Sequence, residues 1–413
     1  MEYGLIAKQL GHSFSPAIHA MIGSYGYETV ELTEAELPRF LAAGDFSGVN
    51  VTIPYKETVI PYLDHISDEA RRIGAVNTIV RRGRELWGYN TDFGGMTALF
   101  HHMGFSTLAE KKVLILGSGG TSRTAYAVAQ AMDASCILRV SRRVQDGCIT
   151  YEEAHRRHRD AQVVINTTPC GMFPDVGGCP IDPAAFPALT CVLDAVFNPL
   201  RSSLVLASRQ CGAAAEGGLY MLVRQAILAS ELFTGHTPPP DTQERVYSAL
   251  LRQKENPVLI GMPSSGKTTV GRLLAKRLDR PFVDLDEVIV RQAGCSIREI
   301  FQKHGEEGFR RIEAEAVRST AAQTGAVIAT GGGCILRPDN VTELRKNGRF
   351  YFLDRPLANL LPTEDRPLAQ SADQLRRLYE TRLPLYRAAA DVTVPVDAPA
   401  EIIAGRIAED FIL

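Results

Sequence analysis

Residues Pro257 to Thr269, PVLIGMPSSGKTT, decide how the rest of the chain is interpreted. A short apolar run, Val258 to Ile260, leads into a loop with the spacing G-x-x-x-x-G-K-[ST], and apolar residues at helical spacing follow from Val270. A strand, a glycine-rich loop and a helix in this order are typical of a site for the phosphates of a nucleoside triphosphate. Such a loop usually follows the first strand of its domain. We therefore expect a domain boundary just before it and a different domain upstream.

The composition is that of a soluble α/β protein with more than one domain. The chain has 413 residues, of which 45% are hydrophobic and 22% are charged, and this length favours two or three domains. A net charge of -2 gives no basic surface for nucleic acid or an anionic membrane, so we predict neither as a partner. No apolar run approaches the ~20 residues of a membrane span, and the N-terminal residues lack the pattern of a signal peptide. The eight cysteines are scattered without a C-x-x-C pair, which indicates reduced thiols in a cytoplasmic protein rather than disulfides or a zinc site.

Four short motifs lie in the first 105 residues, and each places a polar group in a turn between apolar segments. They are S-x-S-P at Ser13–Pro16, N-V-T-x-P-x-K at Asn50–Lys56, G-A-V-N-T at Gly74–Thr78 and N-T-D-x-x-G at Asn90–Gly95. Singly, each has an ordinary explanation: the two serines can cap the helix that follows them, and Lys56 can be a solvated surface lysine. The apolar alternation of Val49, Val51 and Ile53 predicts a strand. Lys56 would then project from the end of that strand.

In this order the four motifs closely resemble the substrate domain of the shikimate dehydrogenase family. The resemblance implies a site for the carboxylate and hydroxyls of shikimate, lined by Ser13, Ser15, Thr52, Lys56, Asn77 and Asp92. Hydride transfer at a carbinol carbon needs a group that gives or takes the hydroxyl proton, and a lysine bonded to a carboxylate can do this. We therefore predict Lys56 as the acid/base, with Asp92 as the partner that polarises and positions it.

A second glycine-rich loop follows the apolar run Lys112–Leu116 and precedes a helical pattern. Its sequence has the first two glycines of the dinucleotide-binding fingerprint and a small serine, Ser122, at the third position. The next strand ends at Arg142 and Arg143, where NAD-binding folds usually have an acidic residue on the ribose. Two guanidinium groups favour a 2′-phosphate, and hence NADP over NAD; a solvated basic turn is the alternative. The predicted cofactor residues here are Gly117, Ser118, Gly119, Gly120, Thr121, Ser141, Arg142 and Arg143.

Three later segments also resemble the dehydrogenase family, namely Asn166–Met172, Asp194–Pro199 and Gly218–Gln225. The resemblance implies that Gly218 approaches the nicotinamide and that Gln225 reaches the substrate. Phe197 stands where the family usually has a tyrosine. Loss of that hydroxyl removes one hydrogen bond, worth about 1 kcal/mol, and would relax selectivity toward quinate. We interpret it as tuning of a working site.

A run of helix breakers, Thr234–Pro240, separates the two halves and contains three consecutive prolines. The residues from Asp241 onward have a helix-capping start and predict a short helix. We expect a semi-rigid linker here, with the boundary near Gln253. The expected domains are a substrate-binding domain over 1–105, a Rossmann NADP-binding domain over 106–235, a Pro-rich linker with a short helix over 236–254, and a P-loop kinase domain over 255–413.

Five motifs follow the P-loop in order: PFVDLD at Pro281–Asp286, FRRIE at Phe309–Glu313, TGGG at Thr330–Gly333, DRPL at Asp365–Leu368 and RLPLY at Arg382–Tyr386. This set closely resembles the shikimate kinase family across the whole domain. In the P-loop, Lys267 would reach the phosphates and Thr268 would bind Mg²⁺. The residues expected at the nucleotide are Gly261, Ser264, Ser265, Gly266, Lys267, Thr268 and Thr269.

The resemblance also implies roles on the acceptor side. Asp286 would hydrogen-bond the attacking hydroxyl, and Asp284 would support Mg²⁺. The substrate carboxylate would lie between Arg310, Arg382 and the backbone of Gly332, and Arg366 would sit on a mobile lid over the phosphates.

The residues alone predict three further details of the kinase domain. Asp284 and Asp286 are expected on the same face of one strand, because side chains two apart in a strand point the same way. Arg311 and Glu313 are expected as an ordinary pair on a helix face. The segment 354–365 that leads into the lid is short, which puts the lid motion in doubt.

Both halves thus point to the same small hydroxy acid. We predict an α/β protein with an α/β substrate domain, a Rossmann-type NADP domain and a three-layer P-loop kinase domain. It would reduce 3-dehydroshikimate with NADPH and then phosphorylate the resulting shikimate with ATP and Mg²⁺, as a cytoplasmic monomer or homodimer. The alternatives are a quinate/shikimate oxidoreductase running catabolically, a non-catalytic sensor of nucleotide or substrate, and a kinase that acts on gluconate or a nucleoside monophosphate.

Overall fold

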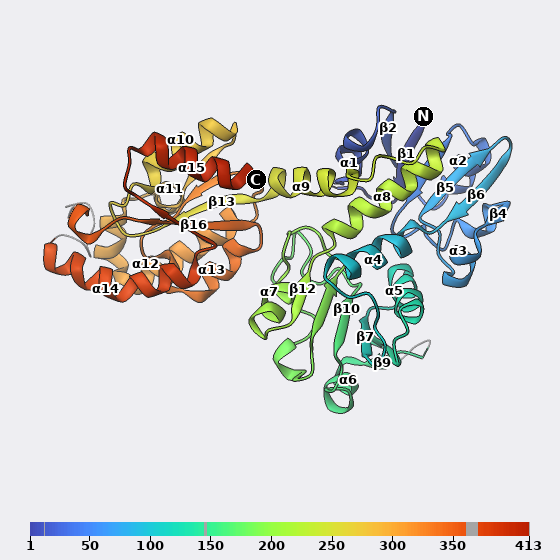
Figure 1. Cartoon of the computed structure of the whole chain (residues 1–413), viewed down its shortest axis with the longest axis horizontal. Coiled ribbons are helices and arrows are strands. Elements are labelled where there is room, and N and C mark those ends of the chain that lie inside the picture. Colours follow the sequence, from blue (N-terminus) through green and yellow to red (C-terminus); the bar gives the residue numbers. More distant parts are fainter. Residues whose placement is uncertain (12, 144–146, 361–370, 413) are drawn as a thin grey trace. The chain divides into compact units, whose positions relative to one another are not determined.

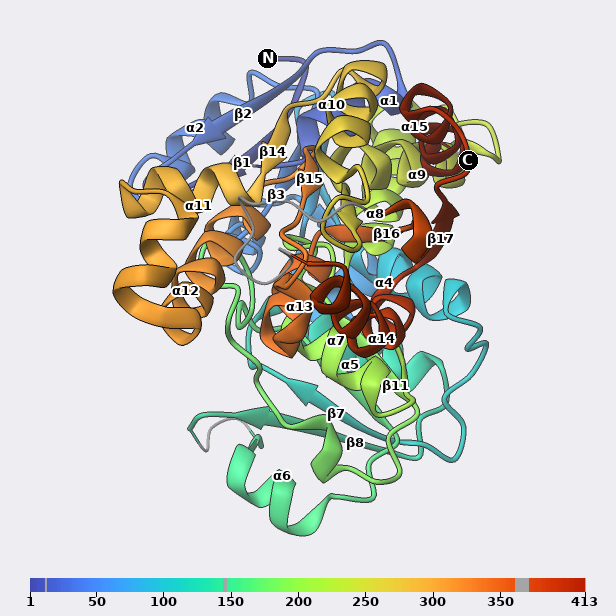
Figure 2. The ribbon, with the colours of Figure 1, turned by 90° about the vertical axis from the view of Figure 1, so that its left-hand side faces the viewer.

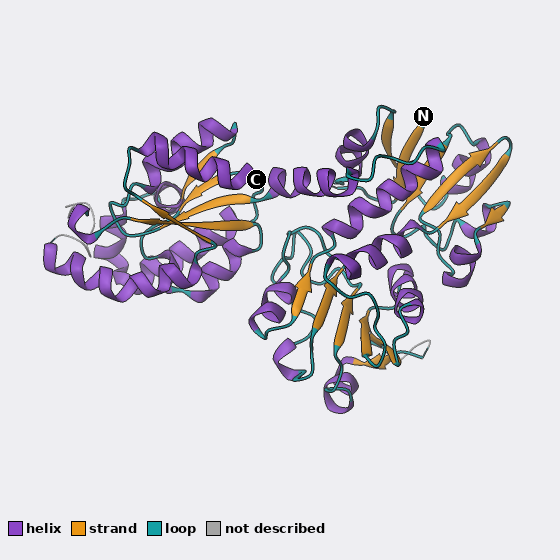
Figure 3. Ribbon diagram, viewed as in Figure 1, coloured by secondary structure: helices purple, strands orange, loops and turns teal. Residues whose placement is uncertain are grey.

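The computed structural model describes residues 1–11, 13–143, 147–360 and 371–412, and it divides into two compact units, Met1–Leu250 and Leu251–Leu413 (Figure 1). Three sheets with helices packed on them make up the two units (Figure 3). The eight cysteines all lie among the described residues, and each is a free thiol. None of the helices in the described ranges has the length and apolar character that crossing a bilayer requires.

The first sheet of the first unit has the strand order β2-β1-β3-β5-β6-β4. Its strands are β1 (Tyr3–Ala7), β2 (Tyr27–Glu31), β3 (Gly48–Val51), β4 (His65–Ile66), β5 (Thr78–Arg82) and β6 (Glu85–Tyr89). The helices that accompany them are α1 (Ser15–Ile22), α2 (Leu37–Ala43) and α3 (Asp68–Ile73). β1 runs parallel to β2 and β3, whereas β5 is antiparallel to β3 and β6.

Strand β3 is shorter than the sequence predicts. Val49 and Val51 are buried, but the strand ends at Val51, and Ile53 is 71% exposed. The chain turns at once, because the Tyr55 N–H donates to the Thr52 carbonyl. The expected continuation of the strand through Ile53 is therefore wrong, and Lys56 lies in the turn that follows.

The second sheet is fully parallel, with the order β12-β11-β10-β7-β8-β9. Its strands are β7 (Lys112–Leu116), β8 (Cys136–Ser141), β9 (Ile149–Thr150), β10 (Val163–Asn166), β11 (Cys191–Asp194) and β12 (Ala214–Glu216). The helices of this part are α4 (Thr91–His102), α5 (Gly120–Ala131), α6 (Tyr151–Arg157) and α7 (Ser203–Gln210). This is the strand order of a Rossmann domain, and the predicted fold class is confirmed.

Helix α8 (Leu219–Thr234) packs along α4 and continues to the first sheet. Near its end, Phe233 stacks on Tyr3 with ring centroids 4.9 Å apart, and the Tyr3 hydroxyl donates to the Phe233 carbonyl. α8 therefore belongs to both sheets, whereas the expected boundaries at 105 and 235 assign it to the nucleotide domain alone.

Helix α9 (Thr242–Lys254) is the helix expected in the linker. Its side chains Val246 and Leu250 are fully buried, and Glu244 accepts a hydrogen bond from the Tyr220 hydroxyl at 2.7 Å. As far as Leu250, this helix is part of the first unit.

The second unit contains a parallel five-stranded sheet with the order β14-β15-β13-β16-β17 (Figure 2). Its strands are β13 (Asn256–Ile260), β14 (Phe282–Asp284), β15 (Val327–Ala329), β16 (Gly348–Asp354) and β17 (Val392–Pro395). The helices are α10 (Lys267–Leu278), α11 (Leu285–Ala293), α12 (Ile297–Ala321), α13 (Pro338–Arg345), α14 (Ala372–Ala389) and α15 (Ala400–Ile412).

Alternate residues of the central strand β13 enter two different cores. Val258 and Ile260 pack with the core under α12, α13 and α14, whereas Leu259 packs with the core under α10 and α15. Because successive side chains of a strand point to opposite faces, β13 has helices on both sides. The second unit is therefore the predicted three-layer α/β domain, with the P-loop at the end of its central strand.

Candidate active sites

A cavity of about 410 Å³ in the first unit collects the residues that the sequence selects for the substrate. Its lining includes Ser13, Ser15, Thr52, Lys56, Asn77, Asp92, Thr121, Gly218 and Gln225. These residues come from the loops after β1 and β3, from the starts of α1, α4 and α5, from the residue before β5, and from α8 with the glycine before it, so the fold brings together segments spread over more than half of the chain.

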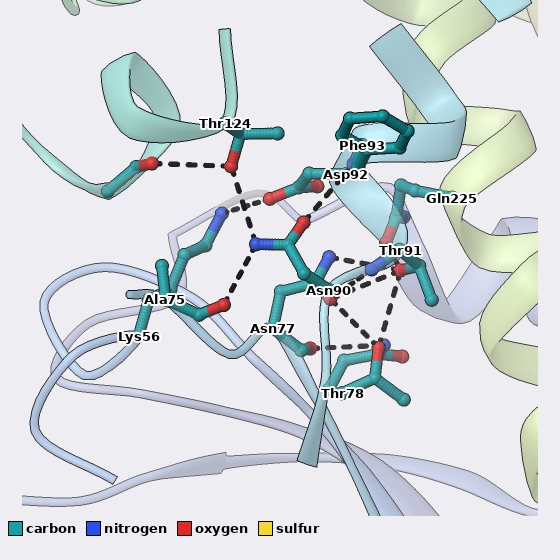
Figure 4. Close-up of polar contacts among 12 residues, drawn as sticks. Lys56, Ala75, Asn77, Thr78, Asn90, Thr91, Asp92, Phe93, Thr124 and Gln225 are labelled. Carbon is teal, nitrogen blue, oxygen red and sulfur yellow. Dashed lines mark hydrogen bonds and ion pairs between the residues drawn. The ribbon is translucent and has the colours of Figure 1, made fainter. Parts of the chain in front are cut away.

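The centre of this cleft is an ion pair between Lys56 and Asp92 (Figure 4). Lys56 Nζ donates to Asp92 Oδ2 at 2.6 Å, and the two side chains are 15% and 10% exposed. Asp92 lies in the first turn of α4, where the helix dipole favours a carboxylate, and Asn90 caps that helix by accepting the Phe93 N–H. The Lys56 carbonyl accepts the Val76 N–H, which fixes the turn that carries the lysine.

A buried polar network holds the amides of the cleft (Figure 4). Asn77 Oδ1 accepts the backbone N–H of Thr91 at 2.7 Å, and the Thr91 hydroxyl donates to Gln225 Oε1 at 3.4 Å. Thr91 thus links Asn77 to Gln225, although the two lie on different elements.

The two serines line the cleft, and one of them also makes a local bond. Ser13 Oγ accepts the Ser15 N–H at 3.2 Å, whereas the N-cap residue of α1 is Phe14 and makes no side-chain cap bond. Of the two serines that were expected to cap the helix, Ser13 therefore bonds the first N–H of α1, and Ser15 is itself the first residue of the helix.

Sequence reasoning missed Asn50 as a residue of the cleft. Asn50 lines the cavity and is buried, and its Oδ1 accepts the Tyr27 hydroxyl at 2.7 Å. Its position at the head of the N-V-T-x-P-x-K motif was the signal that could have identified it.

The glycine-rich loop after β7 has the shape that a dinucleotide needs. Gly117 has a φ of 118°, and a Cβ there would lie 2.5 Å from Thr167 Oγ1. A Cβ on Gly119 would meet nothing within 4 Å, which leaves open space above the start of α5. Buried Ser122 donates to the Gly117 carbonyl at 2.8 Å, which explains why a small residue occupies the third fingerprint position.

Two other parts of the expected nucleotide site are Gly218, which is closely packed, and the end of β8, which is followed by exposed residues. A Cβ on Gly218 would lie 2.4 Å from the Ala195 carbonyl oxygen, so glycine is required for the close approach of these loops. Ser141 ends β8, and the exposed Arg142 and Arg143 follow it. Ser118, Gly120 and Thr121 belong to the loop and the first turn of α5, and a Cβ on Gly120 would lie 3.7 Å from the Cβ of Lys56.

The P-loop of the second unit lies between β13 and α10. Gly261 and Gly266 have φ values of 150° and 100°, which glycine adopts readily. Buried Lys267 donates from Nζ to the carbonyls of Gly261 and Met262, each at 2.8 Å. The Ser265 hydroxyl is buried and has no hydrogen-bond partner among the described residues, as expected of a loop that awaits an anion.

A hydroxyl and a carboxylate lie together where Mg²⁺ is expected. Thr268 Oγ1 donates to Asp284 Oδ2 at 2.8 Å, and oxygen ligands of this kind suit Mg²⁺. The expectation that Asp284 and Asp286 share a strand face is wrong. Asp284 ends β14 and caps α11 by accepting the Asp286 N–H at 3.0 Å, so Asp286 lies in the helix.

The three glycines after β15 bring the acceptor residues together. A Cβ on Gly331 would lie 2.8 Å from Asp286 Oδ1, and one on Gly333 would lie 2.4 Å from both terminal nitrogens of Arg310. The Gly332 carbonyl accepts a hydrogen bond from Arg382 at 2.9 Å. Gly331 and Gly333 therefore each leave room for a predicted substrate residue, whereas a Cβ on Gly332 would lie 2.9 Å from Pro263.

Arg310 and Arg382 have different electrostatic surroundings. Arg310 contacts Glu313 at 2.9 Å and Glu306 at 3.1 Å. Burial raises the pKa of Glu313, and the Arg310 guanidinium opposes that change. Burial lowers the pKa of Arg382, whose side chain is among the most buried charged groups of the domain. Two guanidinium groups on one glycine run can bind a carboxylate bidentately.

Two expectations about this domain need correction or remain open. Glu313 pairs with Arg310 rather than with Arg311, because residues three apart on a helix face each other and residues two apart do not. Arg366 and residues 361–365 of the segment that leads into the lid lie outside the described residues.

The fold and the two sites define a nucleotide-dependent dehydrogenase joined to a P-loop kinase, and comparison with known proteins agrees. Family models match at 5–79 (shikimate dehydrogenase substrate binding domain), 218–251 (shikimate 5′-dehydrogenase C-terminal domain) and 263–411 (shikimate kinase). A shikimate dehydrogenase (NADP⁺) of Halothermothrix orenii is 38% identical over 263 residues, which are 57% of this chain and 91% of that protein.

Solved structures resemble the first unit. Shikimate 5-dehydrogenase of Thermus thermophilus, in complex with NADP(H) and shikimate, has a TM-score of 0.54 and 29% identity, over 60% of this chain and 99% of that chain. Quinate dehydrogenase of Corynebacterium glutamicum, in complex with NAD, has a TM-score of 0.52 and 26% identity, over 61% of this chain and 98% of that chain.

The chain therefore belongs to the shikimate dehydrogenase family and carries a shikimate kinase domain after it. It is a bifunctional enzyme of the shikimate pathway, as its sequence predicts.

Proposed function

We propose that the first unit reduces 3-dehydroshikimate to shikimate with NADPH, and that the second unit phosphorylates this shikimate to shikimate 3-phosphate with ATP. The observation that carries the first step is the Lys56–Asp92 pair at 2.6 Å, next to the glycine-rich loop. The second step is supported by the glycine run that places Asp286, Arg310 and Arg382 in the same domain as a P-loop.

In the dehydrogenase, NADPH when bound supplies a hydride to the carbonyl carbon. The Lys56 ammonium gives a proton to the carbonyl oxygen, which becomes the new hydroxyl, and Lys56 regains a proton from solvent. Asp92 accepts a hydrogen bond from Nζ and so keeps the ammonium directed at the substrate. Asn77, Thr52 and Gln225 would hold the ring hydroxyls, and Ser13 and Ser15 would hold the carboxylate.

In the kinase, Mg²⁺ when bound would be held by Thr268 and Asp284 and would neutralise phosphate charge. Lys267 now donates to two loop carbonyls, and its Nζ would exchange them for phosphate oxygens. Asp286 would accept a hydrogen bond from the attacking hydroxyl and orient it, while Arg310 and Arg382 hold the substrate carboxylate. Arg366 stays a prediction as the lid residue.

A coupled assay tests both steps. The purified chain receives 3-dehydroshikimate, NADPH, ATP and Mg²⁺; NADPH absorbance reports the first step, and mass spectrometry of shikimate 3-phosphate reports the second. We expect Lys56→Ala to slow NADPH oxidation by about 10²- to 10⁴-fold and Asp286→Asn to leave shikimate largely unphosphorylated. An intact chain that oxidises no NADPH, or that consumes ATP equally well with gluconate or a nucleoside monophosphate, contradicts the proposal.

A quinate/shikimate oxidoreductase is the second candidate, because Phe197 replaces the family's usual tyrosine. The Phe197 ring lies against the Phe14 ring with centroids 5.3 Å apart, so the cleft has an apolar wall at this point. We expect shikimate with NADP⁺ to give the higher kcat/KM, measured against quinate and against NAD⁺. A higher value for quinate would favour the second candidate, and no turnover of either would indicate a sensor.

We also propose that the enzyme works in the cytoplasm, as a monomer or homodimer. Its eight free thiols support a reducing compartment. Size-exclusion chromatography with light scattering would determine the number of subunits.

A further inference from the structure

A buried carboxylate that the mechanism does not use, Asp194, lies under the dehydrogenase cleft. Asp194 is the last residue of β11, and its side chain is fully buried. Its Oδ1 accepts hydrogen bonds from Asn166 Nδ2 at 2.9 Å and from the Val196 N–H at 3.0 Å. Its Oδ2 accepts the Ser202 hydroxyl at 2.5 Å. Three donors from three segments of the chain therefore converge on one carboxylate.

Two of these donors lead to loops that line the cleft. Asn166 ends β10, and its Oδ1 accepts both the N–H and the hydroxyl of Thr168, at 3.0 and 2.7 Å. The cavity is lined by Thr167, Thr168 and Pro169 on this loop, and by residues 195–198 on the loop that contains Val196. Asp194 thus ties the loop after β10 to the loop after β11, and both face the place where nucleotide and substrate would meet.

The third donor connects the carboxylate to a helix. Ser202 is the N-cap residue of α7, and its Oγ accepts the Val205 N–H at 3.2 Å while it donates to Asp194. The carboxylate therefore also lies near the amino end of an α-helix, where a negative charge is favoured.

The three donors match a carboxylate better than an amide. An asparagine at 194 has one acceptor oxygen, so its NH₂ group would either face the Asn166 donor or force Ser202 to become an acceptor. The hydrogen-bond partners of Asp194 are all neutral, so three dipoles stabilise the buried charge. Burial raises the pKa of Asp194 to about 6, although these three hydrogen bonds oppose the change.

Among the described residues, the thiols of Cys170 and Cys179 interact electrostatically with Asp194. Burial raises the pKa of both thiols, so they stay neutral in acid and do not compensate its charge. A proton taken up by Asp194 would replace a charged acceptor by a neutral acid at the junction of the two loops. Ser202 would then change from donor to acceptor, and the bonds to Asn166 and Val196 would weaken.

We propose that Asp194 is a positioning residue for the nucleotide loops of the dehydrogenase, and that its ionisation makes NADP(H) binding depend on pH. This proposal rests on the proposed dehydrogenase function. In the ionised state the two loops are held at the spacing that the nicotinamide requires. In the protonated state they loosen, so the KM for NADP(H) rises and kcat for bound substrate changes less.

The test measures KM and kcat for NADP⁺ at saturating shikimate, with the full chain, from about pH 5 to about pH 8. We expect the KM of the wild type to rise about three- to tenfold per pH unit below about pH 6. Ser202→Ala should move this rise to higher pH, because it removes a donor that stabilises the carboxylate. Asp194→Asn should raise the KM for NADP⁺ at every pH and abolish its rise below about pH 6, which we call the acid limb.

A neighbouring serine provides the matched control. Ser203 lies in the same helix turn but donates to the Val176 carbonyl at 3.2 Å, so Ser203→Ala should leave the acid limb where it is. A thermal melt followed by circular dichroism reports whether the dehydrogenase unit of each variant is folded, and kinase activity of the same samples reports the amount of intact chain. An acid limb that is unmoved in Ser202→Ala, or that persists in Asp194→Asn, overturns the proposal. Absence of shikimate oxidation in the wild type at every pH would instead overturn the proposed function.

Discussion

Lys56 and Lys112 make ion pairs of the same length, and they allow a direct test of the catalytic role. Each Nζ lies 2.6 Å from an aspartate oxygen, but Lys56 faces the cleft with a 10% exposed partner, whereas Asp160, the partner of Lys112, is 64% exposed. We expect Lys56→Ala to reduce dehydrogenase kcat by about 10²- to 10⁴-fold, the usual contribution of a general acid. Kinase turnover in the same preparation should be unchanged.

Lys112→Ala is the matched control for that variant. An exposed ion pair contributes about 0.2–1 kcal/mol to stability, so this change should leave both activities near the wild-type values. A lower melting temperature of the dehydrogenase unit in Lys56→Ala would show misfolding, and equal dehydrogenase loss in the two variants would contradict the assignment of Lys56.

Arg142 tests the choice of cofactor. The exposed guanidinium follows β8 in the place where it would meet a 2′-phosphate. A charge-assisted hydrogen bond contributes about 1.5–3 kcal/mol, so Arg142→Ala should raise the KM for NADP⁺ by about 10- to 100-fold and change that for NAD⁺ little. Arg156→Ala, on the exposed side of α6, is the control. An unchanged NADP⁺ to NAD⁺ ratio in Arg142→Ala disproves the role.

Gly333 tests the acceptor side of the kinase. A methyl group there would lie 2.4 Å from both terminal nitrogens of Arg310, which Glu313 and Glu306 hold in place. Gly333→Ala should therefore displace the guanidinium and raise the KM for shikimate by about tenfold, the effect of losing roughly 1.4 kcal/mol. The KM for ATP and the dehydrogenase kinetics should stay constant. A rise in the KM for ATP alone would place Arg310 elsewhere in the mechanism.

Residues that lie in short motifs could be predicted from the sequence, whereas residues that act through distant partners could not. Lys56, Asn77 and Asp92 each lie in a short motif, and the four motifs taken together in their order identify them. Two of the three donors to Asp194, Asn166 and Ser202, belong to other segments, and no local pattern connects these three residues.

At the scale of elements, helices and strands follow from apolar periodicity, but their neighbours do not. The pattern after Gly218 predicts a helix, yet it does not show that α8 reaches the first sheet through Phe233. Asp286 illustrates an error in the end of a strand. The sequence predicts that β14 continues to Asp286, but the strand ends two residues earlier, because the Asp284 carboxylate caps a helix that begins at Leu285.

The contribution of helix α9 to the stability of the first unit can be tested at one buried side chain. Val246 is fully buried against the first unit, whereas Ser248 on the same helix is half-buried. Val246→Ala should lower the free energy of unfolding of the dehydrogenase unit by about 2 kcal/mol through the cavity it leaves. Calorimetry should show a lower Tm for the transition that carries dehydrogenase activity, and Ser248→Ala should show almost no change. A variant as stable as the wild type would mean that α9 is a tether without a packing role.

At the scale of the whole molecule, the first unit has two sheets and the second has one, and each unit has its own hydrophobic core. Residues 251–254 end helix α9 and belong to the second unit. Within that unit, the Arg252 guanidinium donates to the Ile412 carbonyl, and the Arg252 backbone carbonyl accepts a hydrogen bond from the Arg280 guanidinium. A cut between 250 and 251 therefore keeps the contacts of each core intact. This makes the two activities separable in principle.

We expect the separately produced pieces 1–250 and 251–413 to fold and to keep their kcat values within about twofold of the intact chain, because domains with separate cores unfold as separate cooperative units. Circular dichroism melts and the two single-step assays measure this, with a cut at 235 as the control. The piece 1–235 lacks Val246 and Leu250, so its exposed apolar surface should make it unstable. If 1–250 is inactive while the intact chain is active, the dehydrogenase needs residues beyond its own core. A fully active 1–235 would show that α9 is dispensable.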